Sequence, residues 1–210
     1  AVCSAGRSCE PDRSYINSDY KGRNAMKNFN REYTAFALCG LNCGLCPMYH
    51  MEKPCPGCGG GEGNQSCAIA RCSLEHGGPA HCSQCGEFPC ARYEGLTGYD
   101  SFLSHRNMLR DLKRAEEMGY PAYRAELEEK MEILRKLLLQ YNDGRRKTFF
   151  CTAVNLLELE DARAVMEQIE AGTGPEQGLK ERAAAAADCF RTMADSRGIS
   201  LKLRKKPKKA

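Results

Sequence analysis

Ten of the fourteen cysteines in this chain lie in a single stretch that runs from Cys39 to Cys90. They come in small groups with two to four residues between neighbours, and the C-x2-C pair occurs three times. Two intervening residues allow a tight turn to point both thiolates at one metal ion. The sequence therefore predicts a metal-binding module, whose candidate ligands are Cys39, Cys43, Cys46, Cys55, Cys58, Cys67, Cys72, Cys82, Cys85 and Cys90.

A secreted disulfide scaffold is the alternative explanation for so many cysteines. Such scaffolds are usually shorter than about 100 residues and belong to an oxidising compartment. Here the cysteines gather in about a quarter of the 210 residues, and residues 1–25 show no apolar segment typical of a signal peptide. We therefore expect reduced thiols that ligate metal, in a cytoplasmic protein.

Ten cysteines are enough for two four-ligand sites, with two to spare. The simplest sequential pairing gives one site made of Cys43, Cys46, Cys55 and Cys58, and a second that takes four ligands from Cys67, Cys72, Cys82, Cys85 and Cys90. Two C-x2-C pairs brought together make the tetrahedral thiolate cage of structural zinc. Zinc also contributes folding free energy, which a glycine-rich module with few large apolar side chains needs. Zinc is therefore the favoured metal.

An iron–sulfur cluster is the competing hypothesis for the same cysteines. Cys39, Cys43 and Cys46 have the spacing C-x3-C-x2-C, whose three thiolates can hold a [4Fe–4S] cluster with one iron left open. The spacing also marks radical S-adenosylmethionine enzymes, but those continue into a strand-rich partial barrel, whereas this chain continues into more cysteines and then helices. That enzyme class is a distant third, and no catalytic constellation is visible elsewhere.

The chain after the cysteines shows helical periodicity. Apolar residues predict helices over residues 101–118, 121–141, 147–157, 159–171 and 175–197, the first capped by Ser101 and including Phe102 on its apolar face. Ile199, Leu201 and Leu203 alternate with polar residues and predict a brief strand or extended arm. We expect a mostly α protein, in which a loop-rich cysteine module is docked on a bundle of about four helices.

Composition shifts divide the chain into four parts. We expect a poorly ordered N-terminal extension over 1–25, the cysteine module over 26–98, a helical domain over 99–198 and a basic tail over 199–210. The remaining candidates for chemistry have plainer explanations: His50, His76 and His81 are either extra ligands or loop histidines, and Cys151 and Cys189 fit small buried apolar residues in helices.

Charge is unevenly distributed along the sequence. The chain has 31 Lys and Arg against 27 Asp and Glu, and seven of the basic residues follow Ser196, so the remainder is slightly acidic. The segment Lys202–Lys209 can contact nucleic acid through phosphates, while a protein partner or a solubilising role are the alternatives. No run approaches the roughly 20 apolar residues that span a bilayer, so no membrane is expected.

Four motifs together resemble a known family. The segments CGLNCGLCP, CPGCGGG, CAIARC and CSQCGEFPC are similar to those of the domain-of-unknown-function 3795 family, whose members are short cysteine-rich prokaryotic proteins. The resemblance covers about Leu38 to Gly119, including Ser104–Arg106, and places all ten clustered cysteines at typical positions. It implies an intracellular protein with shared ligand positions. It lends no catalytic residue, because the family has no established activity.

Overall fold

The computed structural model describes residues 29–61, 67–174 and 176–206. Within these ranges the chain forms α-helices joined by loops and 3-10 turns, without a β-strand, so the expected mostly α fold is confirmed. The α-helices are α1 (Ala68–Glu75), α2 (Met108–Met118), α3 (Tyr120–Gln140), α4 (Lys147–Leu156), α5 (Leu159–Gly172) and α6 (Leu179–Ser196). The 3-10 turns are η1 (Cys43–Leu45), η2 (Pro47–His50), η3 (Cys82–Gln84), η4 (Ala91–Tyr93) and η5 (Leu96–Gly98).

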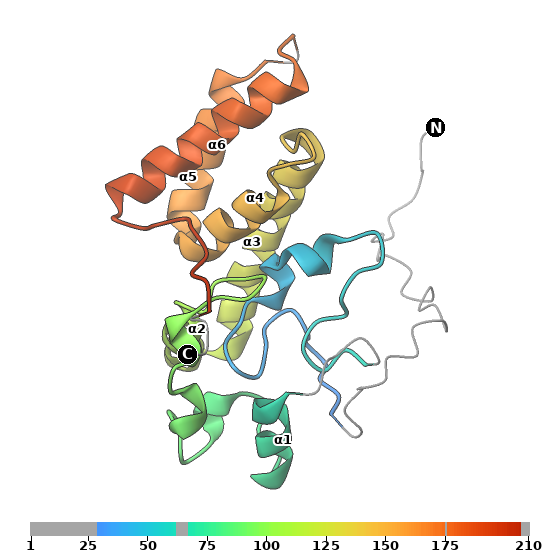
Figure 1. Cartoon of the computed structure of the whole chain (residues 1–210), viewed down its shortest axis with the longest axis vertical. Coiled ribbons are helices and arrows are strands. Elements are labelled where there is room, and N and C mark those ends of the chain that lie inside the picture. The colour runs from blue at the N-terminus through green and yellow to red at the C-terminus, as the bar shows by residue number, and fades with distance from the viewer. Residues whose placement is uncertain (1–28, 62–66, 175, 207–210) are drawn as a thin grey trace.

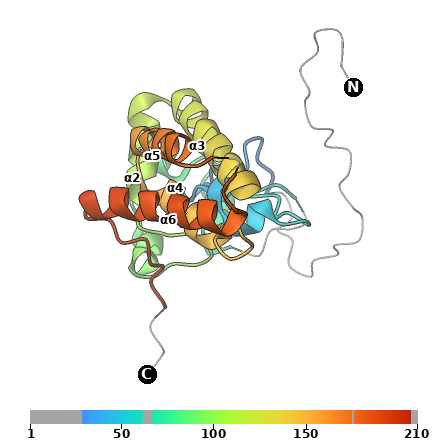
Figure 2. The same cartoon turned by 90° about the horizontal axis from the view of Figure 1, so that it is seen from above.

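Helix α3 is the centre of the helical half, since it packs against α2, α4 and α5. Its residues Leu127, Leu134 and Leu137 are at most 2% exposed, because their spacing places them on one face of the helix. Helix α6 lies across α4 and α5 and buries an alanine-rich face with Phe190 (Figure 2). Figure 1 shows α5 and α6 at one end of the molecule, and α2 with the cysteine module at the other. In the described residues no helix is both long and apolar enough to cross a membrane.

The predicted start of the first long helix at Ser101 is wrong. Helix α2 begins at Met108, and residues 101–107 form an irregular loop in which Phe102 is 61% exposed. The carboxylate of Asp100 explains the difference, since it accepts hydrogen bonds from the backbone amide of His105 (2.8 Å) and the hydroxyl of Ser104 (3.2 Å). These contacts turn the chain back on itself, and tertiary contacts thus override the local helical pattern.

The predicted end of the last helix agrees with the structure. Gly198 adopts a left-handed backbone (φ 66°), and the amide of Ile199 bonds the carbonyl of Ala194 at 2.8 Å, as expected for a glycine that ends a helix. The start differs, because α6 begins at Leu179 rather than near residue 175, which itself lies outside the described residues. The predicted extension over 1–25 lies outside them too.

Residues 199–206 form the C-terminal arm, which is extended and belongs to no sheet. Arg204 donates from its backbone amide to Asp100 Oδ2 (2.7 Å) and from Nη2 to Asp100 Oδ1 (2.8 Å). Arg106 fixes an earlier part of the arm. Its Nη1 donates a hydrogen bond to the carbonyl of Ser200 (2.5 Å), and its Nη2 donates one to the carbonyl of Lys202 (2.8 Å). Part of the predicted basic tail is therefore an anchored segment, and Arg204 is paired with a carboxylate whose side chain is 0% exposed.

Replacing Asp100 by Asn is expected to release the C-terminal arm. Burial raises the pKa of this carboxyl, but the hydrogen bonds and charge of Arg204 outweigh burial and hold the pKa well below its ordinary value. The stabilisation is therefore present above the unfolded pKa of about 3.9 and is lost only as the pH falls through the lower folded value. Hydrogen exchange at pH 7 should be faster for the arm amides of Asp100→Asn. The control Asp188→Asn removes an exposed ion pair and should leave the arm unchanged; equal arm exchange in both variants would contradict the expectation.

Candidate metal centre

A short apolar segment, Ala35–Leu38, holds the cysteine groups together. Its residues are at most 3% exposed, although they belong to no regular helix or strand. Carbonyls in and just before it accept amide hydrogen bonds from three separate parts of the module: Thr34 from Cys58 (3.1 Å), Ala35 from Gly44 (2.8 Å) and Leu38 from Cys82 (2.9 Å). The segment is thus a spine onto which distant C-x2-C pairs are fixed.

Two of the three C-x2-C pairs have the same backbone geometry. In η1 the amide of Cys46 bonds the carbonyl of Cys43 at 3.0 Å, and in η3 the amide of Cys85 bonds that of Cys82 at 3.0 Å. Side chains three residues apart eclipse one another in a 3-10 turn, so both thiols of a pair lie on the same side. This arrangement is the one that the spacing predicts for paired ligands.

The third pair, Cys55 and Cys58, depends on a glycine between them. Gly57 has φ 81°, and a Cβ at this position would lie 2.4 Å from the carbonyl oxygen of Thr34. Only glycine satisfies both the left-handed backbone and the close approach. The pair is therefore fixed against the spine through the close contact of Gly57 with Thr34.

We call Cys39, Cys43, Cys46, Cys55, Cys58 and Cys67 the first thiol group. Burial raises the pKa of Cys43 well above its ordinary value, and the neighbouring thiols of Cys58, Cys39, Cys46 and Cys55 raise it further. Burial likewise raises the pKa of Cys39 to about 12, with contributions from Cys58 and Cys67. Such mutual repulsion between thiolates is the electrostatic condition that a bound cation relieves.

Backbone amides offset part of this cost in the first thiol group. The pKa of Cys46 is raised by burial but lowered by hydrogen bonds that the amides of Met48 and Tyr49 donate to its sulfur. An amide of Leu41 acts in the same way on Cys39. Amide-to-sulfur hydrogen bonds from the residues just after a ligand stabilise a thiolate and orient it, as the surroundings of metal ligands commonly do.

We call Cys72, Cys82, Cys85 and Cys90 the second thiol group. All four line one small cavity of about 30 Å³, whose walls include Ile69, Phe88 and Tyr93. Burial raises the pKa of Cys82 to about 11; the nearby Tyr93 hydroxyl lowers it, and the thiols of Cys90, Cys72 and Cys85 raise it. The cavity therefore brings together cysteines from α1, η3 and the loop before η4.

Thiolates from tight turns are donors that suit a thiophilic ion such as zinc or the iron of a cluster. In the part of the chain that the structure describes, however, no three His, Cys, Asp or Glu side chains are gathered closely enough to hold a metal ion. The donor chemistry thus fits a metal, while the ligand role of the ten cysteines stays a prediction. The sequential pairing predicts a first site of Cys43, Cys46, Cys55 and Cys58. In the structure, Cys39 and Cys67 are additional neighbours of this set.

The histidines of the module serve different purposes. His50 Nε2 lies 2.7 Å from the carbonyl oxygen of Gly44, and the His81 ring stacks on Tyr120 with centroids 4.2 Å apart. Burial, with a smaller effect of Arg31, lowers the pKa of His81 to about 4. His76 is different, because its Nδ1 lies 3.6 Å from the sulfur of Cys72 in the second thiol group.

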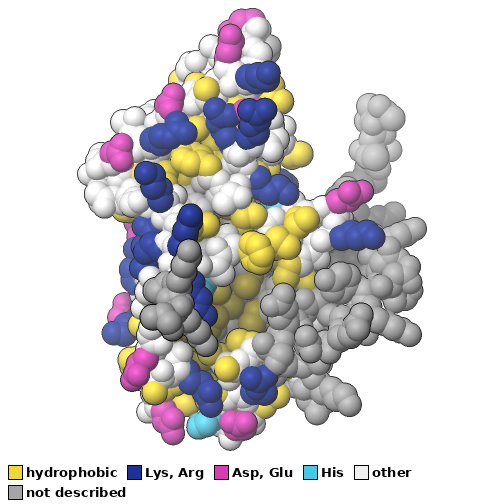
Figure 3. All heavy atoms as spheres, viewed as in Figure 1, with side chains coloured by type: hydrophobic (Ala, Val, Ile, Leu, Met, Phe, Trp, Pro, Cys, Tyr) yellow, Lys and Arg dark blue, Asp and Glu magenta, His cyan; other side chains and the backbone are white. Residues whose placement is uncertain are grey.

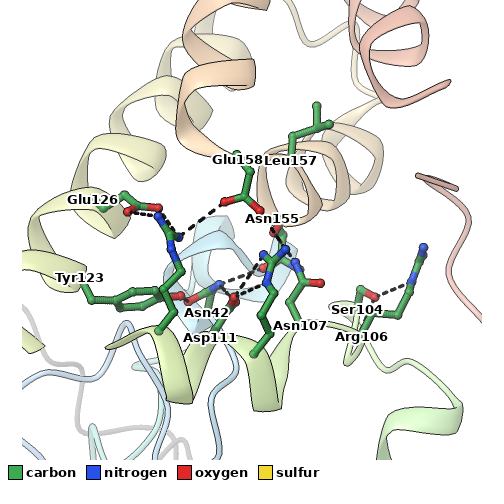
Figure 4. Close-up of polar contacts among 12 residues, drawn as sticks. Asn42, Ser104, Arg106, Asn107, Asp111, Tyr123, Glu126, Asn155, Leu157 and Glu158 are labelled. Atoms are coloured by element: carbon green, nitrogen blue, oxygen red, sulfur yellow. Dashed lines mark hydrogen bonds and ion pairs between the residues drawn. The ribbon is translucent and has the colours of Figure 1, made fainter. Parts of the chain in front are cut away.

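Asn42, which lies between two predicted ligands, faces the helices. Its Nδ2 donates to Asp111 Oδ2 (2.9 Å) and Asn155 Oδ1 (3.2 Å), and its Oδ1 accepts from the hydroxyl of Tyr123 (3.0 Å) (Figure 4). All four side chains are at most 5% exposed. The network joins the cysteine module to α2, α3 and α4. Asn42 was not singled out from the sequence, since its partners are distant along the chain.

Cys151 was expected to be a small buried apolar residue, and it is 0% exposed in α4. Burial raises its pKa to about 12, with a further contribution from Cys46 of the first thiol group. Helix α4 packs directly on η1 and η2, which explains this proximity. The other helical cysteine, Cys189, is only partly buried.

A comparison with protein families supports the resemblance that the motifs suggest. The model of the family described as "Protein of unknown function (DUF3795)" matches residues 35–95, which contain the spine and both thiol groups. The match ends before Ser104–Arg106, so the resemblance is shorter than the expected range to Gly119. No curated protein and no solved structure matches the chain. The matched segment is cysteine-rich and consistent with metal binding.

Proposed function

We propose that this protein is a zinc-binding protein, in which the two thiol groups hold structural metal centres and the helices with the C-terminal arm contact a protein partner. The observations that support the proposal are the amide hydrogen bonds that fix parts of both thiol groups on one spine, and the single cavity that the four cysteines of the second group line. Each group also contains a C-x2-C turn in which both side chains are expected on the same side. We place the protein in the cytoplasm, where cysteines remain reduced.

Zinc is the metal that the second thiol group favours. Four cysteines are the full complement of a structural zinc site, and apolar side chains such as Ile69 and Phe88 contribute to the cavity wall. Bound zinc would supply a cross-link between α1, η3 and the loop before η4. The chain's own contribution is the nearby Tyr93 hydroxyl, which lowers the pKa of Cys82 and so favours its thiolate.

A [4Fe–4S] cluster is the second candidate, and it rests on the first thiol group. Cys39 and Cys46 are among the neighbouring thiols that raise the pKa of Cys43, which supports the proximity of the three cysteines of the C-x3-C-x2-C motif. Three thiolates are sufficient for a cluster with one open iron. On this alternative the protein would take part in electron transfer or redox chemistry.

The proposed partner contact involves the face that carries the C-terminal arm. A groove between α4, the end of α6 and the arm contains Phe149 and Leu201 together with two basic residues, Arg191 and Lys202, and one acidic residue, Asp195. Figure 3 shows hydrophobic side chains gathered in a hollow near the middle of one face, with Lys and Arg side chains beside it. A mixed apolar and basic surface suits an acidic protein segment, and nucleic acid is the alternative partner.

Elemental analysis of anaerobically purified protein, with a visible spectrum of the same sample, tests the proposal. We expect two zinc ions per chain and no colour. Cys85→Ser should lower the content by one zinc, because the second thiol group then has three thiols, whereas the control Cys151→Ser should leave it unchanged. Detection of iron with acid-labile sulfide would favour the [4Fe–4S] cluster over zinc. A folded protein without metal would refute both hypotheses.

A further inference from the structure

Arg31 lies between the two thiol groups, although it precedes the segment that the family model matches. Its Nη1 donates to the carbonyl of Phe36 (2.6 Å) and its Nη2 to that of Ala80 (2.9 Å). Its backbone amide bonds the carbonyl of Gly59 at 3.0 Å. One residue thus contacts the spine, the Cys58–Gly59 turn and the chain just before Cys82.

The Arg31 guanidinium also reaches both thiol groups more directly. Its positive charge also acts on the thiol of Cys58, which belongs to the first group. Its Nη2 lies 3.3 Å from Nδ1 of His81, the residue before Cys82 of the second group. The positions of Cys58 and Cys82 are in turn fixed by the spine, through the carbonyls of Thr34 and Leu38.

The chemistry of arginine suits a connecting role. A guanidinium is always charged and presents its donors in a rigid planar fork, so its contacts constrain one another. A divalent ion with four thiolates leaves a net negative charge, which a neighbouring cation stabilises. Filling the first centre would therefore order the guanidinium, and the ordered guanidinium would hold the Ala80–His81 backbone where Cys82 belongs.

We propose that Arg31 couples the two metal centres, so that filling either one raises the affinity of the other for zinc. This inference rests on the proposed function. Coupling between sites is reciprocal and commonly amounts to ~5–150-fold in affinity. Arg92, which hydrogen-bonds Cys72, provides a contrast, because it lines the cavity of the second thiol group and is exposed.

A double-mutant cycle with zinc as the probe tests the coupling. Zinc affinity of the first centre is measured by competition with a chromophoric chelator, with and without Cys85→Ser, which disables the second centre. In the background with Arg31, Cys85→Ser should weaken the first centre at least ~5-fold. In the Arg31→Gln background, Cys85→Ser should cause no further loss. The control Arg92→Gln should weaken the second centre and leave the coupling intact.

The possible results separate the inference from the proposed function. Wild-type protein that binds no zinc would refute the proposed function. Zinc binding with the same effect of Cys85→Ser in both backgrounds, or with no effect in either, would refute only the role of Arg31. Tyr93 is a second link between the two groups, because it lines the cavity of the second group and donates to the carbonyl of Cys39 in the first (3.3 Å). The Arg31→Gln variant keeps Tyr93, so a loss of coupling in this variant is due to Arg31.

A second variant keeps the test decisive if Arg31→Gln does not fold. His81→Phe removes the Nδ1 contact with Arg31 and retains an aromatic ring to stack on Tyr120. We expect the same cycle in this background to show a smaller coupling than in the wild type. Undiminished coupling in His81→Phe, with folding verified by far-UV circular dichroism, would overturn the proposed link between Arg31 and the second centre.

Discussion

Removal of zinc is expected to unfold the cysteine module while the helices remain folded. The described module buries few large apolar side chains beyond Phe36, Leu38 and Leu45 of the spine and η1. Structural zinc contributes about 10–16 kcal/mol of apparent binding free energy, which is as large as the whole stability of a typical domain. The helical half has its own core around α3, with Leu134 and Phe150 at 0% exposure.

Alkylation of thiols with iodoacetamide, read by mass spectrometry before and after chelation, measures this outcome. Eight of the ten cysteines of the two thiol groups, the number that two four-ligand sites use, should be protected before chelation and should react soon after it. Cys151 is the internal control, because it is 0% exposed in α4 and should stay protected in both samples. Identical labelling before and after chelation would show that metal does not hold the module together.

Replacement of Asp111 by Ala is expected to cause a large loss of stability. The carboxylate is 3% exposed and accepts hydrogen bonds from Asn42 (2.9 Å) and from Nη2 of Arg110 (3.2 Å). The buried ammonium of Lys130, which donates to the carbonyl of Leu157 (2.7 Å), relies on it as an anionic neighbour. Removing one member of a buried charged group costs about 3–5 kcal/mol, because the remaining charge is left uncompensated.

Urea denaturation at pH 7 checks this expectation. The free energy of unfolding should fall by about 3–5 kcal/mol in Asp111→Ala. The control Glu132→Gln changes a carboxylate whose side chain is 66% exposed, so its effect should stay within about 0.5 kcal/mol. A loss of less than about 1 kcal/mol in Asp111→Ala would mean that the network around Asn42 does not stabilise the junction between the module and the helices.

The helices were predictable because their evidence is local. In α3, the stripe that includes Leu127 and Leu134 repeats at helical spacing, and the structure buries it as expected. The start of α2 was not predictable, because Asp100 redirects the loop through contacts with Ser104 and with Arg204, a residue far along the chain. Periodicity contains no information on such distant partners.

In the candidate site, too, the local features were predictable from the sequence and the contacts between distant residues were not. Spacing correctly indicated that the thiols of Cys43 and Cys46, and those of Cys82 and Cys85, lie on common turns. It did not reveal that Cys39 and Cys67 neighbour Cys58, since that proximity arises from the folded spine. Arg31 had no signal in the sequence either, because a single arginine in a polar segment is typical of a solvated surface.

The pairing of Asp100 with Arg204 has a consequence for the order in which parts of the chain fold during synthesis. The two residues lie 104 positions apart, so the loop that leaves the cysteine module gains its contacts with Arg204 only after a further 104 residues have been synthesised. On the ribosome, the module emerges well before the arm that secures its exit. A nascent chain that stalls before residue 204 would therefore carry the complete set of ten clustered cysteines with an unsecured exit loop.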